Sequence, residues 1–141
     1  MNKTILIGIF ALFMTAGCKA QSSDEKAIKE TIIGFSKAGD KNDADKLATY
    51  LDDNYRIVMN RLFGSSEVSV MTKDIYLEKI RTKEYGGDNR KVEIESIVLN
   101  GSTASAKVSF VGSKMTFVSI FNLIKDGNNE WKLVSDVPVM K

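Results

Sequence analysis

The chain has no histidine, and among its 141 residues it has one cysteine, one proline and one tryptophan. Without histidine there is no imidazole to act as a general acid or base near neutral pH, and none to activate a serine or cysteine nucleophile. A single cysteine cannot form an internal disulfide, and the two shortages together exclude a metal site built from nitrogen and sulfur ligands. We therefore expect no metal and no cofactor, and a domain held together by its apolar core.

Neither sign of charge predominates, since 20 Lys and Arg residues stand against 18 Asp and Glu residues and give a net charge of +2. Basic and acidic residues are interspersed, as at Glu25-Lys26 and Lys29-Glu30. Nucleic-acid binding requires a basic stripe, whereas this pattern is typical of solvated helix faces. We expect no nucleic-acid partner.

The first residues have the pattern of an export signal. Lys3 precedes an apolar run from Ile5 to Met14, and small residues then lead to Cys18. The run is shorter than the roughly 18 apolar residues that a membrane-spanning helix needs, and no other segment approaches that length. We predict a signal peptide over residues 1–17, a tether over residues 18–23 and one domain over residues 24–141.

Two cleavage sites are compatible with this signal. Thr15-Ala16-Gly17-Cys18 resembles the lipobox of bacterial lipoproteins, in which cleavage precedes the cysteine and the cysteine then carries acyl chains. Cys18 is thus the predicted lipidation site, which would anchor the protein in a membrane of the cell envelope. The alternative is ordinary cleavage after Ala20, which would remove residues 1–20 and yield a soluble periplasmic or secreted protein beginning at Gln21.

Hydrophobic periodicity predicts helices first and strands afterwards. Ser22 and Glu25 have the spacing of a capping box, and apolar residues then recur at helical intervals in Ile28, Ile32, Phe35 and Ala38. A shorter helix carries Leu47, Tyr50 and Leu51, and a third begins after Thr72. Alternation with a period of two predicts strands over residues 54–63, 67–71, 91–99, 103–111, 114–125 and 130–139. This order indicates an α+β domain with helices packed on one face of a mainly antiparallel sheet.

Four segments carry a resemblance to a known family: Asp74–Leu77, Tyr85–Val92, Gly101–Val108 and Asn129–Val134. In this order and spacing they resemble the "Putative lumazine-binding" family, a branch of the nuclear transport factor 2-like superfamily, over nearly all of residues 24–139. The resemblance implies a cone-shaped fold in which a curved sheet wraps against helices around a pocket, often in a homodimer formed through the open sheet face. The superfamily includes isomerases, dehydratases, hydrolases and binding modules, so the fold does not decide the function.

Candidate ligand-binding residues come from the predicted strands and the third helix. Strand alternation places aromatic, thioether and cationic side chains, Phe121 among them, on common faces. The predicted ligand-binding residues are Tyr55, Met59, Arg61, Tyr76, Met115, Phe117 and Ser119. Most of these belong to an apolar core under any hypothesis. Arg61 differs, because a cation on an apolar face must reach an edge, pair with an acid or bind an anionic ligand. A flat, partly anionic heterocycle or acid would suit such a site.

A catalytic alternative uses carboxylic acids. An enzyme of this fold without histidine would work as ketosteroid isomerase does in principle, with an aspartate as base and a tyrosine that stabilises an oxyanion. The candidates are Asp74, Asp136, Tyr50, Tyr55 and Tyr76. Against this, strand alternation places Asp136 on the solvent face with Lys132, opposite Leu133 and Val137. Asp74 lies in the first turn of a helix, where the helix dipole favours an acid.

We therefore expect an exported, lipid-anchored protein that binds a small molecule without catalysis, and we assign no catalytic residue. The first alternative is a cofactor-free isomerase or dehydratase, which requires a carboxylic acid facing the cavity with a tyrosine within hydrogen-bonding reach. The second is a dimeric interaction module, which requires a large apolar outer face on the sheet, with Val118, Ile120 and Ile124 as candidates.

Overall fold

The computed structural model describes residues 14–141, with side chains from residue 23 onward. The helices are α1 (Met14–Asp40), α2 (Ala44–Ala48) and α3 (Lys73–Arg81). The strands are β1 (Leu51–Asn60), β2 (Val68–Thr72), β3 (Lys91–Asn100), β4 (Thr103–Val111), β5 (Thr116–Lys125) and β6 (Trp131–Met140). Most of the predicted signal peptide therefore lies outside the described residues. Among those that are described, no helix has the length and apolar character needed to cross a membrane.

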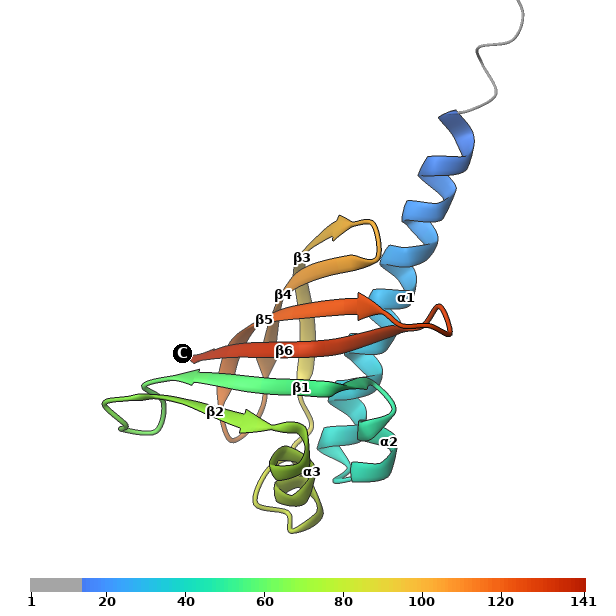
Figure 1. Ribbon diagram of the computed structural model, residues 1–141. Coiled ribbons are helices and arrows are strands. Elements are labelled where there is room, and N and C mark those ends of the chain that lie inside the picture. The colour runs from blue at the N-terminus through green and yellow to red at the C-terminus, as the bar shows by residue number, and fades with distance from the viewer. Residues whose placement is uncertain (1–13) are drawn as a thin grey trace, which may run out of the picture.

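The six strands form one sheet in the order β2-β1-β6-β5-β4-β3, shown in Figure 1. Only β1 and β6 pair in parallel, and every other neighbouring pair is antiparallel. The prediction of an α+β fold with a mainly antiparallel sheet is confirmed. β1, which follows the first two helices, therefore lies next to β6, the last strand of the chain.

The starts of α1 and β1 differ from the sequence prediction. Helix α1 begins at Met14 rather than at a cap on Ser22, because residues 14–21 contain good helix formers such as Ala and Met and no proline that would stop the helix. Leu51, predicted to end the second helix, is instead the first residue of β1. There it pairs with Leu133 of β6, so sheet pairing overrides the local helical spacing.

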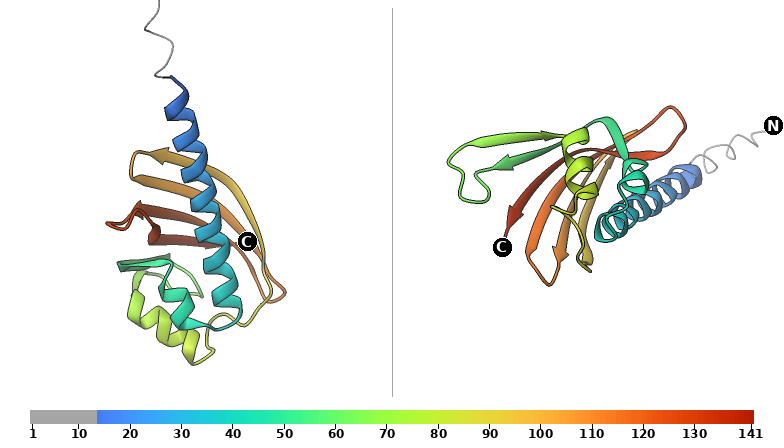
Figure 2. Two further views of the ribbon diagram at one scale, coloured as in Figure 1. Left: turned by 90° about the vertical axis from the view of Figure 1, so that its right-hand side faces the viewer. Right: turned by 90° about the horizontal axis from the view of Figure 1, so that it is seen from below.

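The helices cover the concave side of the curved sheet, as Figure 2 shows for α1. Ile28, Ile32 and Phe35 of α1 are buried against the sheet, as their spacing predicted. Tyr76 and Ile80 of α3 are buried as well and close the other side of the core. The core thus fills the space between the sheet and the helices, and one end of that space remains open as a cavity.

One irregularity in β6 changes which side chains point inward. Leu133 pairs with Leu123 of β5, whereas Ser135 pairs with Asn122, so Val134 is an extra residue without a partner on β5. Such a β-bulge shifts the alternation of a strand by one residue, and bulges are often found beside functional sites, where they redirect a side chain.

The bulge overturns the predicted environment of Asp136. Trp131 and Leu133, before the bulge, are buried in the core. After it, Asp136 is the buried residue, 5% exposed, and Val137 lies on the opposite side, paired with the half-exposed Ile120. The prediction that Asp136 shares a solvent face with Lys132 is therefore wrong, because it assumed unbroken alternation along the strand.

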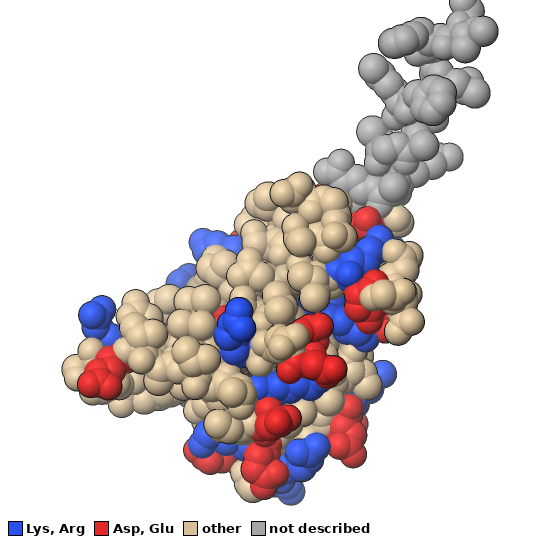
Figure 3. All heavy atoms as spheres, in the orientation of Figure 1, with Lys and Arg blue, Asp and Glu red and all other residues tan. Residues whose placement is uncertain are grey.

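The outer face of the sheet carries exposed apolar residues. Val98, Val111, Ile120 and Val139 are each more than two-fifths exposed, and the strand pairings place them on the side away from α1. Figure 3 shows uncharged residues over much of the upper part of the molecule and side chains of both charges around the helices below. Homodimer formation through this face stays a prediction.

Replacing Trp131 by alanine tests the core. Trp131 is 4% exposed, and its Nε1 donates a 3.2 Å hydrogen bond to Asp24 of α1. The Trp131→Ala variant should lose about 3–5 kcal/mol of unfolding free energy, because a large buried side chain is removed and a cavity is left. Phe63→Ala, which removes a 61% exposed aromatic side chain, serves as the control and should change stability by about 0.5 kcal/mol or less. Equal losses in urea denaturation would contradict this description of the core.

Candidate functional site

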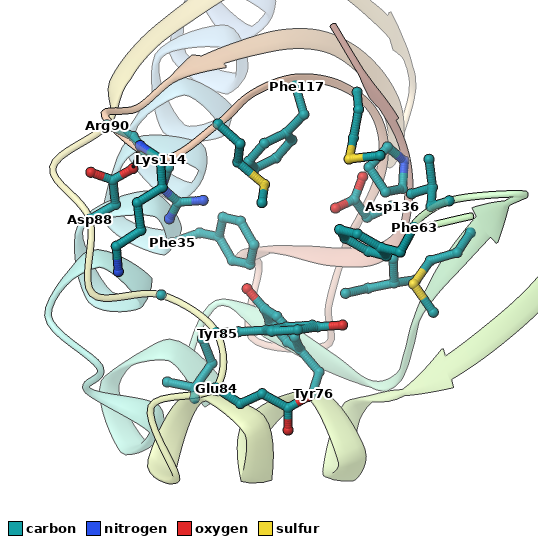
Figure 4. Close-up of a pocket in the computed structure, with 18 residues that line it drawn as sticks. Phe35, Phe63, Tyr76, Glu84, Tyr85, Asp88, Arg90, Lys114, Phe117 and Asp136 are labelled. Atoms are coloured by element: carbon teal, nitrogen blue, oxygen red, sulfur yellow. Dashed lines mark hydrogen bonds between the residues drawn. The ribbon is translucent and has the colours of Figure 1, made fainter. Parts of the chain in front are cut away.

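A cavity of about 390 Å³ opens between the concave side of the sheet, α1 and α3. It is lined by side chains from α1, α3, the three strands β1, β5 and β6, and the loops between elements, drawn in Figure 4. Most of the lining is apolar, and the charged residues that reach it are Glu84, Asp88, Arg90, Lys114 and Asp136. Among residues 23–141, no acidic or cysteine side chains form a group of three suited to hold a metal ion.

Aromatic rings form much of the cavity wall. Tyr76 is at the centre of one group, with ring centroids 6.3 Å from Phe35, 5.9 Å from Tyr55 and 6.4 Å from Tyr85. Burial raises the pKa of Tyr76 well above its usual value, and the nearby charge of Arg90 opposes that rise. Tyr76 therefore stays a neutral hydroxyl that can donate a hydrogen bond into the cavity.

Asp136 is the acid at the inner end of the cavity. It pairs with Ile57 of β1 and Phe121 of β5, so its carboxyl lies among apolar neighbours on both sides. Burial raises its pKa to about 7, while the hydroxyl of Ser119 and the charge of Arg90 act in the opposite direction. An acid with this pKa is present in both protonation states near neutral pH.

Three buried polar atoms around this acid lack a hydrogen bond of regular geometry to any of residues 23–141, although the Ser119 hydroxyl lies near enough to Asp136 to lower its pKa. They are Oδ1 of Asp136, the hydroxyl of Tyr55 and the hydroxyl of Ser119. The negative charge of Asp136 raises the pKa of Tyr55, after burial itself, which places the two side chains close together. An unpartnered buried polar group costs about 1–3 kcal/mol, so a cluster of them is typical of a site whose network a bound molecule completes.

A buried ion pair forms the opposite end of the cavity. The backbone N–H and Nε of Arg90 donate to the two carboxylate oxygens of Asp40, at 3.0 and 2.5 Å, and Nη2 donates to the carbonyl of Ser36 at 3.1 Å. The guanidinium also lies over the rings of Phe110 and Phe117, 5.3 and 5.8 Å from their centroids. These contacts fix Arg90 between α1 and the sheet, and Figure 4 shows Phe35 and Phe117 between it and Asp136.

The loop after β1 forms part of the rim. Phe63 lines the cavity yet is 61% exposed, and its backbone has a positive φ of 55°. Arg61 adopts a similar conformation, with φ of 53°. Its Nε donates to the carbonyl of Ser66 at 3.2 Å.

The predicted position of Arg61 on an apolar strand face is therefore wrong. Strand β1 ends at Asn60, one residue before Arg61, and the side chain of Arg61 is exposed in the loop. The left-handed backbone turns the chain back toward Glu67, whose carbonyl accepts a hydrogen bond from the Arg61 N–H at 3.2 Å. Arg61 does not line the cavity.

Comparison with known proteins places this chain in a family. The model of the "Putative lumazine-binding" family matches residues 23–137. The chain belongs to that family. Among curated proteins, none shows a significant sequence match.

Solved structures show that the fold is nuclear transport factor 2-like. A protein of this fold from Shewanella baltica superposes with a TM-score of 0.74 and 19% identity, over 85% of this chain and 95% of that one. Another protein of this fold, from Silicibacter pomeroyi, superposes with a TM-score of 0.75 and 16% identity, over 86% of this chain and 98% of that one. Both are described as proteins of unknown function. A "Putative Scytalone Dehydratase" from Novosphingobium aromaticivorans superposes with a TM-score of 0.70 and 14% identity, over 88% of each chain.

The sequence-predicted ligand residues separate into three groups in this family member. Met59, Tyr76, Met115 and Phe117 line the cavity. Tyr55 and Ser119 are buried and do not line the cavity, and Arg61 is exposed outside it. Of the two candidate acids, Asp136 lines the cavity, and Asp74 is exposed in the first turn of α3. Tyr50 is half-buried and packs against Gly34 of α1 rather than against the cavity.

Sequence reasoning missed the charged residues at the cavity mouth. Asp88 and Arg90 lie in a stretch read only as a turn and strand start, and the partner of Arg90, Asp40, is fifty residues away at the end of α1. No local pattern connects these positions. The one sequence feature that could have indicated Arg90 is its place directly before a predicted strand, within a segment that carries the family resemblance.

The pKa of Asp136 should make the stability of the protein pH-dependent in a defined window. The folded-state pKa of about 7 lies above the value of about 3.9 expected in the unfolded chain. The folded protein therefore binds more protons between these values, and stability should fall as the pH rises from about 4 to about 7 and then level off. The slope within the window approaches about 1.4 kcal/mol per pH unit.

Urea denaturation of the wild type and of Asp136→Asn between pH 4.5 and 8 measures this effect. The chain has no histidine to titrate in the window. Burial raises the pKa values of the two nearby tyrosines, Tyr55 and Tyr76, so both stay neutral throughout the window. We expect the wild type to lose stability relative to Asp136→Asn as the pH rises. A constant difference between the two proteins would show that Asp136 is ionised in the folded state.

Proposed function

We propose that this protein binds a small, flat, mainly apolar molecule in the cavity, with Asp136 as the residue that holds its polar end. The observation that carries the proposal is the buried carboxyl of Asp136, which lines the cavity and whose Oδ1 has no hydrogen bond of regular geometry to residues 23–141. A ligand polar group at this position would complete the hydrogen bonding of the carboxyl, which has only the Ser119 hydroxyl near it.

The shape of the cavity supports a planar ligand. Its volume of about 390 Å³ is near the lower end of the roughly 300–1,000 Å³ typical of ligand sites, so the guest is small. The rings of Phe35, Tyr76, Tyr85 and Phe117 offer several faces and edges against which an aromatic guest can stack. The description of the family refers to lumazine, a flat heterocycle, which agrees with these dimensions.

Asp136 can bind two kinds of polar group because of its pKa near 7. In its protonated form the carboxyl donates a hydrogen bond to a ligand carbonyl, and as a carboxylate it accepts one from a ligand N–H or O–H. The Tyr76 hydroxyl, which stays neutral, supplies a second donor on the cavity wall.

Proton transfer within the bound molecule is a second candidate function, favoured by the same pKa. A base is most effective when its pKa lies near the working pH. The carboxylate of Asp136 would take a proton from a carbon beside a ligand carbonyl and return it to the ligand, while the Tyr76 hydroxyl donates a hydrogen bond to the carbonyl oxygen. A solved structure of the same fold is described as a "Putative Scytalone Dehydratase", which is compatible with such chemistry.

Calorimetry with lumazine, 2-naphthol and 2-tetralone tests binding. We expect at least one of these flat compounds to bind the wild type, and Asp136→Asn to bind it about tenfold more weakly, because one hydrogen bond to a charged or acidic group is lost. Asp74→Asn, which changes an exposed acid of α3, is the control and should bind as the wild type does. Equal binding by wild type and Asp136→Asn would contradict the assignment of Asp136.

The same proteins in deuterium oxide separate binding from catalysis. If the protein transfers protons, the wild type should accelerate the exchange of the 2-tetralone protons beside the carbonyl, measured by NMR, and Asp136→Asn should not. Binding without accelerated exchange leaves a binding protein as the function.

We further propose that the chain is exported and anchored through an acylated Cys18. The support is the order of features in the sequence: Lys3, the apolar run to Met14, and the small residues before Cys18. Attached acyl chains would give a stable membrane hold, since each buried CH₂ contributes about 0.8 kcal/mol and more than one chain is present in such anchors.

Replacing Cys18 by alanine should release the protein from membranes to the soluble fraction. Ala20→Lys is the matched control, because a long cation blocks ordinary cleavage after that residue but leaves cleavage before Cys18 possible. We expect the control to stay in the membrane fraction after cell fractionation. Wild-type protein with an unmodified N-terminus at Gln21, found by mass spectrometry, would contradict the anchor.

A further inference from the structure

The mouth of the cavity opposite Asp136 gathers charged groups of both signs. Figure 4 shows Asp88, Arg90 and Lys114 together on the side of the cavity away from Asp136. Asp88 and Arg90 come from the segment between α3 and β3, and Lys114 comes from the turn between β4 and β5. The hydrogen bonds of these residues decide which charge remains available to a ligand.

The acids at this end are already bonded. Asp88 accepts hydrogen bonds from the N–H groups of Asn89, Ser113 and Lys114 at 2.8, 3.2 and 3.3 Å, and from the Ser113 hydroxyl at 2.7 Å. The Ser113 hydroxyl, followed by the Asn89 N–H, holds the pKa of Asp88 well below its usual range. Asp88 therefore acts as an anionic brace that fixes the β4–β5 turn against the loop before β3.

The remaining two acids near this end also have partners. Asp40 is bonded through both carboxylate oxygens to Arg90. Glu84 accepts a 2.5 Å hydrogen bond from Lys79. A cationic ligand would have to compete with these contacts.

The cations, in contrast, have unused donors. Nε and Nη2 of Arg90 are bonded to Asp40 and Ser36, while within residues 23–141 its Nη1 has no hydrogen-bonding partner. Nζ of Lys114 makes one long hydrogen bond, 3.4 Å, to the carbonyl of Gly87, and no ion pair among the same residues. Both side chains line the cavity. Lys114 is thus a cation at the mouth that forms no ion pair with an acid among residues 23–141.

We propose that Arg90 and Lys114 form an acid-binding subsite, so that the protein selects planar carboxylates whose opposite end reaches Asp136. A carboxylate accepts several hydrogen bonds, and donors on two cationic side chains give it charge-assisted contacts. Arg90 is held in place by Asp40 and by the two phenylalanine rings, and Lys114 stands at the exposed rim, where its charge needs little desolvation. The inference rests on the proposed binding function and specifies its ligand class.

Matched neutral and anionic probes test the subsite on the full chain. Naphthalene-2-carboxylate and naphthalene-2-carboxamide have the same shape and differ in charge. Calorimetry should show that the wild type binds the carboxylate at least tenfold more tightly. Lys114→Met, which keeps an apolar stem, should weaken carboxylate binding about tenfold and leave carboxamide binding unchanged. Lys29→Met, on an exposed position of α1, should keep the wild-type preference.

The outcomes separate this inference from the proposed function. If the wild type binds both probes equally, or if Lys114→Met keeps the full preference for the carboxylate, the acid-binding subsite is wrong while cavity binding stands. If neither probe binds and the neutral compounds tested against Asp136→Asn also fail to bind, the binding function itself is wrong. Raising the salt concentration should weaken only the carboxylate, because Lys114 is exposed to screening ions.

Discussion

The functional end of the cavity depends on a single extra residue in the last strand. Strand alternation is strict, so a side chain that faces solvent in a regular strand faces the core once one residue is inserted before it. Val134 is that residue, and it turns Asp136 inward while Trp131 and Leu133 keep their places in the core. Without the bulge the cavity would end in Val137, an apolar side chain with nothing to offer a polar ligand.

The buried carboxyl of Asp136 reduces the stability of the fold, and packing in the rest of the core compensates for this loss. A carboxyl among Ile57, Phe121 and other apolar groups is unfavourable in its charged form, as its raised pKa reports. The long contact between α1 and the sheet stabilises the fold elsewhere, through buried residues such as Ile28 and Ile32. Local strain of this kind, compensated at a distance, is characteristic of binding and catalytic sites.

The sequence predicted the elements far better than it predicted the site. Periodicity located the helices and the meander of strands, because burial of one face imposes a repeat that can be read residue by residue. A bulge leaves no such repeat: Leu133 to Asp136 reads equally well as unbroken alternation, and only pairing with β5 shows the shift. The ion pair of Asp40 and Arg90 could not be predicted either, because the two residues are fifty positions apart in the sequence and meet only in the folded protein.

The ion pair also explains how the two ends of one small cavity can differ in charge. Arg90 is held by Asp40 at the other end of the cavity, away from Asp136. The charge of Arg90 is the last of the three causes that act on the pKa of Asp136, after burial and the Ser119 hydroxyl, so burial sets the direction of the shift. The cavity thus keeps a titratable acid at its inner end and a cationic rim at Lys114, with aromatic walls between them. A ligand that is polar at both ends and flat in the middle matches all three parts at once.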